Sequence, residues 1–417
     1  MEAPRTPLVV AALLAALLVA IGLVSGGGEE GPARTTAAST TTAPGPPAKQ
    51  RLTPVGTVAR RVERIRDLRY RHIPRVHAVT PAQAARAGLA DLDRTYPAAQ
   101  RKADEALLET LGVVPPRTDL RREIGAEFRD EVGGYYDPRT KQLAVVNGAA
   151  TGGALGDIVL AHELNHALED QRFGLHDSGS SAAIDDASLA NSALVEGSAT
   201  AVMYDYAQRF LDPGQALGDL LPALQASGSA HLPRYLEDSL TWPYEGGLSF
   251  VNRLYARLHG WGLVNYALSR RRPATTEQVL HPDKYLTDER PLPVRAPPSP
   301  GSGWTLEAHG TLGEFDTREL LRIAGAEGAD DAAAGWGGGR YALWSRGASH
   351  ALVVSWRWDT PRDARQAVAA LRAYRTFAGR RGPVALAAAG DATALGFAPS
   401  PQLARSLATA SVSRPGR

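Results

Sequence analysis

Two histidines four residues apart, His162 and His166, with Glu163 directly after the first, form an H-E-x-x-H pattern. Residues at positions i and i+4 of an α-helix lie on the same face, so the two imidazoles can bind one metal ion. Glu163 lies at the side of that face, where its carboxylate can act as a general base on a water molecule activated by the metal. The spacing therefore predicts a zinc-binding helix that also carries its catalytic base.

The chain around this pattern favours a helix. Asp157 is a suitable N-cap, and residues 158–171 contain neither glycine nor proline. Leu160, Leu164 and Leu168 recur every four residues on nearly the opposite face from the histidines, where they can pack on a core. The alternative is a pair of surface or partly buried histidines. Because histidine is scarce in this chain, at 10 of 417 residues, we interpret the pattern as a metal site.

A third metal ligand is expected on a second long helix, at residues 188–211. Glu196 lies there among small and apolar residues, an unfavourable place for a carboxylate that has no partner. The competing ligand is Glu169, three residues after His166, but it belongs to the same rigid helix and cannot easily complete a tetrahedron with both histidines. Two histidines and one glutamate, with one position open to water, form a recognised catalytic zinc set. The predicted cofactor is one Zn²⁺ held by His162, His166 and Glu196.

These features resemble the gluzincin branch of zinc metallopeptidases, the thermolysin-like clan. The longer sequence is also similar to a little-characterised group of exported bacterial and archaeal proteins in that clan, over about residues 57–375. The strings that carry this resemblance are GGYYDPRTKQLAVV, AHELNHALEDQRF, ALVEGSAT, WPYEGGLSFV, ATTEQVLHPDKYL, GWGGGRYALW and SWRWDTPRDA.

The resemblance implies an α-rich zincin core that hydrolyses peptide bonds with one zinc ion. Thermolysin-like enzymes also carry an aspartate four residues after the ligand glutamate, where it orients a zinc histidine. Thr200 stands at that position here. The residue that orients the histidines is therefore not assigned by the resemblance.

Three residues beyond these helices are candidates for a hydrogen-bond donor that stabilises the oxyanion of the reaction: Tyr244, His281 and Tyr285. A structural role is the alternative for each of them. Before the zinc helix, residues 133–146 have the composition of a β-hairpin, with an Asp-Pro turn between two strands. The second strand, residues 142–146, can be a sheet edge that a peptide substrate joins by backbone pairing, or part of a purely structural hairpin.

The composition excludes several classes of protein. The chain has no cysteine, which excludes a cysteine nucleophile, a thiolate zinc site and a disulfide framework. Its 46 Lys and Arg residues nearly balance its 44 Asp and Glu residues, so nothing indicates a nucleic-acid partner. A local exception is a helix expected from Val58, which with the residues after it carries seven arginines between Arg60 and Arg75. We interpret them as a solvated helix face, with binding to an anionic surface as the alternative.

The chain divides into five expected parts. Residues 1–24 form a signal anchor or a signal peptide, because an unbroken apolar run spans residues 8–24, and an anchor is favoured because no clear cleavage site follows. The remaining parts are a disordered Ser/Thr/Pro/Gly linker at 25–50, a zincin-like metallopeptidase domain at 51–290, a small α+β accessory domain at 304–380 and a low-complexity tail at 381–417.

The predicted fold class is α+β, with a mainly α-helical zincin-like core, a small edge sheet and a small C-terminal α+β domain. The predicted function is zinc-dependent hydrolysis of peptides or proteins outside the cytoplasm, with the enzyme held at the membrane by its N-terminal segment or secreted. The alternative is a zincin-fold surface protein that binds or scaffolds without hydrolysis. Glu163 argues against the alternative, because a scaffold needs no general base.

Overall fold

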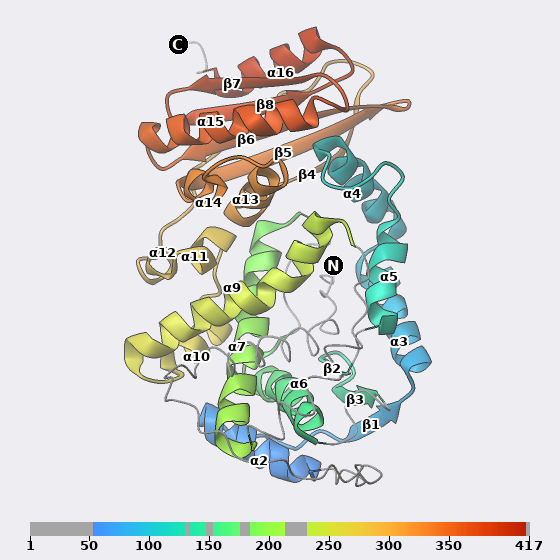
Figure 1. Ribbon diagram of the computed structural model, residues 1–417, viewed down its shortest axis with the longest axis vertical. Coiled ribbons are helices and arrows are strands. Elements are labelled where there is room, and N and C mark those ends of the chain that lie inside the picture. Colours follow the sequence, from blue (N-terminus) through green and yellow to red (C-terminus); the bar gives the residue numbers. More distant parts are fainter. Residues whose placement is uncertain (1–52, 131–132, 147–152, 176–183, 213–231, 414–417) are drawn as a thin grey trace, which may run out of the picture.

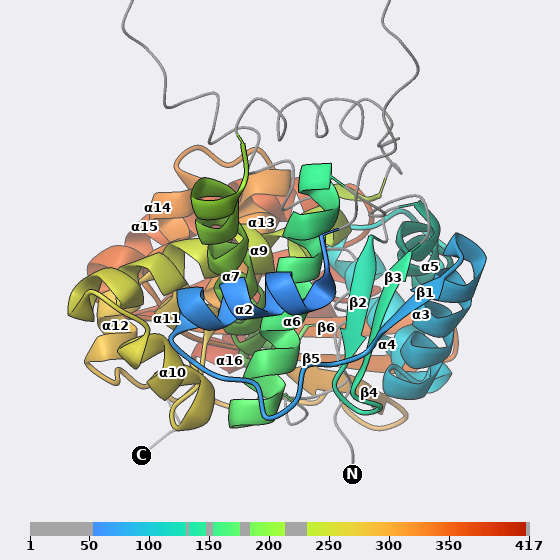
Figure 2. The same ribbon diagram turned by 90° about the horizontal axis from the view of Figure 1, so that it is seen from below.

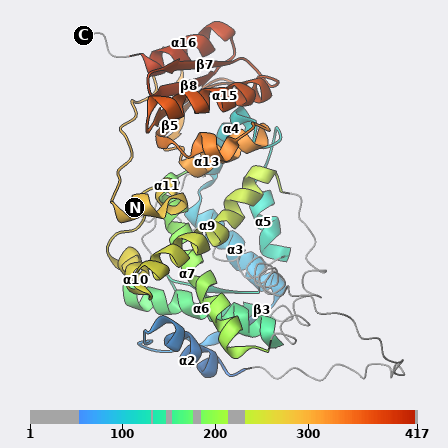
Figure 3. The same cartoon turned by 60° about the vertical axis from the view of Figure 1, so that its left-hand side comes forward.

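The protein is an elongated α+β body with long helices and two separate sheets (Figure 1), as the computed structural model shows. This confirms the α+β class in general. Helix α2 lies at one end of the body and the larger sheet lies at the other, which a second view also shows (Figure 3). The structure describes residues 53–130, 133–146, 153–175, 184–212 and 232–413.

The predicted anchor and linker, residues 1–24 and 25–50, lie outside the described residues. Within the described part, no helix combines the length and the apolar character that crossing a membrane requires.

The described helices carry most of the fold. They are α2 (Val55–Arg66), α3 (Pro81–Thr95), α4 (Ala98–Leu111), α5 (Leu120–Asp130), α6 (Gly153–Phe173), α7 (Asp186–Phe210), α9 (Arg234–Leu258), α10 (Gly262–Ser269), α11 (Thr276–Leu280), α12 (Pro282–Leu286), α13 (Glu314–Ile323), α14 (Ala329–Ala333), α15 (Pro361–Ala378) and α16 (Pro401–Val412).

The smaller sheet has three short strands in the order β1-β3-β2: β1 (Val76–Val79), β3 (Gln142–Val146) and β2 (Gly134–Asp137). β3 pairs in parallel with β1 and antiparallel with β2. The predicted hairpin is therefore present, and of the two alternatives for residues 142–146 the structure excludes the sheet edge. β3 is the central strand because β1, from a distant part of the chain, covers its outer side. The edge beside α6 belongs to β2 (Figure 2).

The larger sheet lies in a C-terminal unit and is antiparallel throughout, in the order β4-β5-β6-β8-β7. Its strands are β4 (Thr305–Gly310), β5 (Trp336–Arg346), β6 (Ser349–Trp358), β7 (Val384–Ala389) and β8 (Ala392–Phe397).

Helices cover both faces of this sheet. Because side chains alternate between the two faces of a strand, Leu352 and Val354 of β6 pack in the core that contains α15, whereas Ala351 and Val353 pack with α16. Residues 381–417 were expected to form a low-complexity tail. Much of this segment is instead ordered in the C-terminal unit, as β7, β8 and α16.

The boundary expected between residues 290 and 304 does not separate the two hydrophobic cores. Leu107, Leu108 and Leu111 of α4 share a core with the strands of the C-terminal unit, and the hydroxyl of Tyr374 donates a 2.7 Å hydrogen bond to the carbonyl of Leu111. The described core clusters are built entirely from residues between Val58 and Leu407. A chain that begins near residue 51 therefore keeps all of them.

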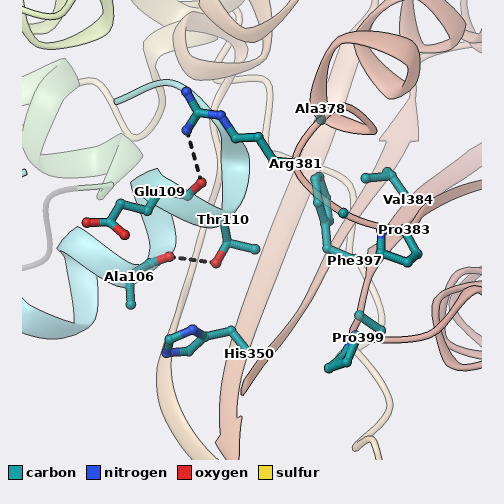
Figure 4. A pocket seen from close by; sticks show the side chains of 12 residues that line it. Ala106, Glu109, Thr110, His350, Ala378, Arg381, Pro383, Val384, Phe397 and Pro399 are labelled. Carbon is teal, nitrogen blue, oxygen red and sulfur yellow. Dashed lines mark hydrogen bonds between the residues drawn. The ribbon is translucent and has the colours of Figure 1, made fainter. Parts of the chain in front are cut away.

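A pocket of about 430 Å³ lies where α4 meets the C-terminal unit (Figure 4). Arg381 crosses this junction and donates a 2.7 Å hydrogen bond to the carbonyl of Val114, while His350 and Phe397 line the other walls. None of the predicted site residues lines this pocket. It belongs to the packing of α4 against the C-terminal unit.

A second junction between the two halves is built around Asp186, at the start of α7. Its Oδ1 accepts hydrogen bonds from the backbone N–H (2.9 Å) and the hydroxyl of Thr276, and the same hydroxyl oxygen accepts from the N–H of Phe315 in α13. Asp186 is almost fully buried, and its Oδ2 has no hydrogen-bond partner among the described residues. Burial, with the nearby negative charges of Asp316 and Glu277, raises the pKa of Asp186 to about 8.

This raised pKa makes stability depend on pH. The folded protein keeps the Asp186 proton up to a pH of about 8, whereas an unfolded aspartate loses it near 4. The contribution to stability is therefore complete below pH 4 and disappears as the pH rises towards 8. With a slope of about 1.4 kcal/mol per pH unit for one proton, we expect the parent to lose about 3 kcal/mol more than Asp186→Asn between pH 5 and pH 7. Denaturant unfolding at both pH values measures this, and equal pH dependence in the two proteins would contradict it.

Candidate metal centre

Helix α6 carries the H-E-x-x-H residues and begins earlier than expected, at Gly153. The prediction of Asp157 as N-cap is therefore wrong. Asp157 lies inside the helix, where it accepts a 3.0 Å hydrogen bond from the hydroxyl of Tyr206 on α7. The leucines expected to face a core are buried, with Leu164 and Leu168 fully so. Tertiary packing thus extends the helix by one turn beyond the local capping signal.

The structure brings His162, His166 and Glu196 together from α6 and α7. The two Nε2 atoms lie 2.9 Å apart, and Oε2 of Glu196 lies 3.3 Å from Nε2 of His162 and 3.5 Å from Nε2 of His166. One ligand atom from each residue lies within 4.8 Å of the other two, and all three side chains are buried. Their donor atoms thus face one common point.

Charge is unevenly distributed in this cluster. Burial alone would lower the pKa of His166, but the negative charge of Glu196 raises it to about 9. Burial would raise the pKa of Glu196, yet the charge on His166 and the close approach of both imidazole rings lower it to about 2. The pKa of His162 falls, chiefly because of burial. The ionised form of Glu196 therefore depends on positive charge close to its carboxylate.

Glu163 lies beside the cluster and is fully buried. Burial raises its pKa to about 8. Neither of its carboxyl oxygens has a hydrogen-bond partner among the described residues, although the backbone N–H of Tyr136 on β2 lies close enough to lower the pKa. A buried carboxyl group without a partner costs free energy and contributes nothing to folding. Such a group is typical of a site where function rather than stability determines the residue.

The edge of β2 that pairs with no described strand runs past Glu163. The N–H of Val146 donates to the carbonyl of Gly133, so the hydrogen-bonded pairs alternate from that residue and the backbone groups of Gly134 and Tyr136 point away from β3. A Cβ atom at Gly134 would lie 3.6 Å from Cγ of Glu163. β2 thus offers backbone donors and acceptors beside the candidate base.

Tyr244 reaches the cluster because α7 and α9 cross at very short range. A Cβ atom at Gly197 or at Gly247 would overlap with the backbone of the opposite helix. This contact places Tyr244, one turn before Gly247, next to Glu196, which directly precedes Gly197. The ring centroids of Tyr244 and His162 lie 6.2 Å apart. Burial, together with the charges of Glu196 and Glu163, raises the pKa of the Tyr244 hydroxyl far above its usual value, so it is a neutral hydrogen-bond donor.

The helix that carries Tyr244 contains residues that usually end a helix. α9 begins at Arg234 and continues through Pro243, Gly246 and Gly247. Proline and glycine inside a helix are unfavourable. Here the close crossing with α7 requires a glycine at position 247, so packing overrides the local preference.

The other two oxyanion candidates lie elsewhere. Nε2 of His281 lies 2.8 Å from Oε1 of Glu314 on α13, and His281 does not belong to the metal group found among the described residues. The hydroxyl of Tyr285 donates a 2.7 Å hydrogen bond to the carbonyl of Arg271, and its ring packs on Phe250. The structure thus brings Tyr244 to the candidate site and gives the other two residues structural partners.

Glu169, the competing third ligand, has a different partner. Its Oε1 forms an ion pair with Arg66 and accepts a hydrogen bond from the hydroxyl of Ser198. This arrangement favours Glu196 over Glu169 as the third ligand. Arg66 was expected on a solvated helix face, which is wrong for this residue, because its side chain is fully buried.

Arg66 connects four helices directly behind the cluster. Its guanidinium donates to Oδ1 of Asn165 on α6 (2.9 Å), to the Ser198 hydroxyl on α7 (2.8 Å) and to Oδ1 of Asn265 on α10 (2.7 Å). It also stacks 4.2 Å from the ring centroid of Trp261. Asn165 directly precedes His166, and Ser198 follows Glu196 by two residues. Arg66 therefore fixes α6 and α7 close to the metal ligands, and the sequence pattern did not reveal it.

No carboxylate forms a hydrogen bond with the Nδ1 atom of either histidine among the described residues. Nδ1 of His162 lies 3.0 Å from Sδ of Met203. Thr200 is buried, but neither its Oγ1 nor Nδ1 of His166 has a hydrogen-bond partner in the part of the chain that the structure describes. Thr200 therefore orients neither histidine through a hydrogen bond in this structure.

A second acidic group also has metal-like spacing, but a lysine fills it. Glu277, Glu289 and Asp359 lie within ligand distance of one another, and Nζ of Lys284 lies 2.6, 2.9 and 2.6 Å from their carboxylates, respectively. The ammonium group supplies the positive charge that these carboxylates require. This cluster is a salt-bridge network between α11, α12 and the end of β6.

Comparison with known proteins identifies only the C-terminal unit. Residues 304–400 match a domain of unknown function, DUF8575. No curated protein and no solved structure matches the chain. The matched region contains none of the residues of the metal cluster.

Proposed function

We propose that this protein is a zinc metallopeptidase with a zincin-like core. The observation that carries the proposal is the convergence of three buried ligand atoms, from His162, His166 and Glu196, beside the buried carboxyl group of Glu163, which has no hydrogen-bond partner among the described residues. Two imidazoles and one carboxylate form a recognised donor set for catalytic zinc. The arrangement of an H-E-x-x-H helix, a three-stranded sheet beside it and a following helix with the third ligand further supports the zincin-like core.

The residues fit a divalent cation. Oε2 of Glu196 is buried without a hydrogen-bond partner among the described residues, and the two histidine nitrogens face each other at 2.9 Å. A cation among them satisfies all three atoms at once. A zinc ion held there supplies a Lewis acid that lowers the pKa of water and polarises a carbonyl group. A nearby positive charge also favours the carboxylate form of Glu163, which a base requires.

Residues of the protein then transfer the proton, stabilise the oxyanion and hold the peptide. Glu163 accepts a proton from the attacking water and passes it to the nitrogen of the departing amine. Tyr244 donates a hydrogen bond to the oxygen that becomes negative as the carbonyl is attacked. The backbone of β2 pairs with the peptide and holds it in an extended form beside Glu163. No contact among the described residues connects His281 with the metal cluster. Its role as a donor that stabilises the oxyanion is therefore still an untested prediction.

The metal ligands can be tested without a substrate. We expect one equivalent of zinc to bind, and His162→Ala, His166→Ala and Glu196→Ala to weaken binding by more than about 100-fold, since even outer residues of zinc sites contribute 10–100-fold. Glu277→Ala, in the lysine-filled cluster, is the matched control and should retain full zinc. Metal analysis of each purified protein measures this. Full zinc in Glu196→Ala would refute the assignment of the third ligand.

We also propose that the enzyme acts on peptides or proteins outside the cytoplasm and is held at the membrane by residues 1–24. The support is the apolar run at residues 8–24 followed by a polar linker, both read from the sequence.

A further inference from the structure

The first helix of the described chain and the segment after it carry a surface rich in arginine. Residues 55–79 contain seven arginines against two carboxylates, although the whole chain is nearly balanced. Arg61 and Arg66 turn inward, to Tyr206 and to the buried network behind the metal cluster. The other five are exposed, and we refer to them as the α2 arginine surface: Arg60, Arg64, Arg69, Arg71 and Arg75.

Little negative charge compensates this surface. Arg69 pairs with Glu63 at 3.2 Å, and its side chain is still 75% exposed. The other four arginines form no ion pair with a carboxylate among the described residues, and Arg60 and Arg64 are neighbours at i and i+4, where like charges destabilise a helix. Apart from Glu63, no described carboxylate forms an ion pair with this surface, so its positive charge is available to an anionic partner.

Two further features suit a lipid surface. Ile73, between the last two arginines, is 41% exposed and is one of the few large apolar side chains with so much contact with water. A hollow of about 390 Å³ beside α2 is lined by Arg64, Arg69, Arg172, Leu68, Glu63 and Asp67, so three guanidinium groups border one depression. Arginines around an exposed aliphatic side chain can bind headgroups and insert the apolar group between them.

The α2 arginine surface lies close in sequence to the proposed membrane anchor, which favours a membrane as its partner. About 30 residues of linker composition separate the end of the apolar run from α2, and a linker of that length has a typical reach of roughly 30 Å. An anchor at residues 8–24 therefore keeps α2 close to the membrane, where binding is effectively intramolecular. α2 also lies at the end of the body opposite the C-terminal unit, across the outer side of α6 and α7 (Figures 1 and 2).

We infer that the α2 arginine surface docks on anionic phospholipid headgroups of the membrane that holds the N-terminal segment. The choice of a membrane rests on the proposed anchoring, but not on peptide hydrolysis. Docking fixes the orientation of the tethered protein and directs the C-terminal unit away from the membrane.

The test uses residues 51–417, which retain all the described core clusters and lack the apolar run. Co-sedimentation is measured with vesicles of phosphatidylglycerol and phosphatidylcholine in equal parts, and with vesicles of phosphatidylcholine alone. We expect binding to the anionic vesicles only. An arginine near such a surface contributes about fivefold, so replacing all five with glutamine should weaken binding about 10³-fold. Binding should also weaken as salt is raised.

Helix α15 and the turn after it provide the matched control, with five exposed arginines at the opposite end of the body: Arg362, Arg365, Arg372, Arg375 and Arg380. Changing these five to glutamine alters the net charge equally and should leave vesicle binding at the parent level. Circular dichroism checks that both variants are folded. Absence of binding to anionic vesicles, equal binding by the α2 variant and the parent, or loss of binding only in the α15 variant would each overturn the inference, whatever the outcome of peptidase assays.

Discussion

Replacing Glu163 with glutamine is expected to lower the rate of peptide hydrolysis about 10²–10⁴-fold, the usual contribution of general acid–base catalysis. The upper end is expected because the same carboxylate takes the proton from water and delivers it to the leaving amine. Glutamine has nearly the same shape but cannot accept the proton. Zinc content should stay at one equivalent, because Glu163 is not among the three ligands.

Thermal stability separates this effect from misfolding. Glu163 is buried without a hydrogen-bond partner among the described residues, so its replacement removes no interaction that stabilises the fold. We expect Glu163→Gln to unfold at a temperature no lower than that of the parent, as seen by calorimetry on the zinc-loaded proteins. A zinc-loaded variant that cleaves peptides as fast as the parent would refute the assigned role.

Replacing Arg66 with methionine is expected to destabilise the protein by about 3–5 kcal/mol, the usual cost of removing one partner of a buried ion pair. The change leaves the charge of Glu169 buried and unpaired, and it breaks the hydrogen bonds to Asn165, Ser198 and Asn265. Because these contacts flank His166 and Glu196, zinc affinity should fall as well, by about 10–100-fold, as for other residues that support zinc ligands. Denaturant unfolding and zinc competition measure the two effects.

Two controls make this prediction specific. Arg60→Met makes the same change on the exposed side of α2, where surface substitutions usually alter stability by less than about 0.5 kcal/mol. The double variant Arg66→Met with Glu169→Met removes both charges and should regain much of the lost stability, because a buried ion pair can often be replaced by apolar residues. If Arg66→Met were as stable as Arg60→Met, or if the double variant were no better than the single one, the buried pair would not have the role we assign to it.

Much of the metal cluster was predictable because helical periodicity determines it. His162 and His166 share a face by spacing alone, and the long helix with Glu196, expected at residues 188–211, is observed as Asp186–Phe210. Thr80 and Thr360 likewise mark the starts of α3 and α15, and each accepts a hydrogen bond from the third residue of its helix. Such signals are local, so a sequence reveals them.

Features that depend on distant contacts were not predictable. Nothing near Arg66 distinguishes it from the exposed arginines around it, because its partners are 99 to 199 residues away in the chain. β1 covers β3 through a pairing between residues 76–79 and 143–146, which no local pattern indicates. The alanine-rich strand β7 has weak strand propensity, and its pairing with β8 and packing against α16 hold it in the sheet.

Digestion of a broad peptide library tests directly whether the protein hydrolyses peptide bonds. Purified residues 51–417, loaded with zinc, are incubated with the library, and the products are identified by mass spectrometry. A parallel sample is stripped with a chelator and then reconstituted with zinc. We predict cleavage that disappears with the chelator, returns with zinc and is lost in Glu163→Gln. A zinc-loaded parent that cleaves no peptide in the library would contradict the proposed peptidase activity. It would favour a protein that binds or scaffolds without hydrolysis.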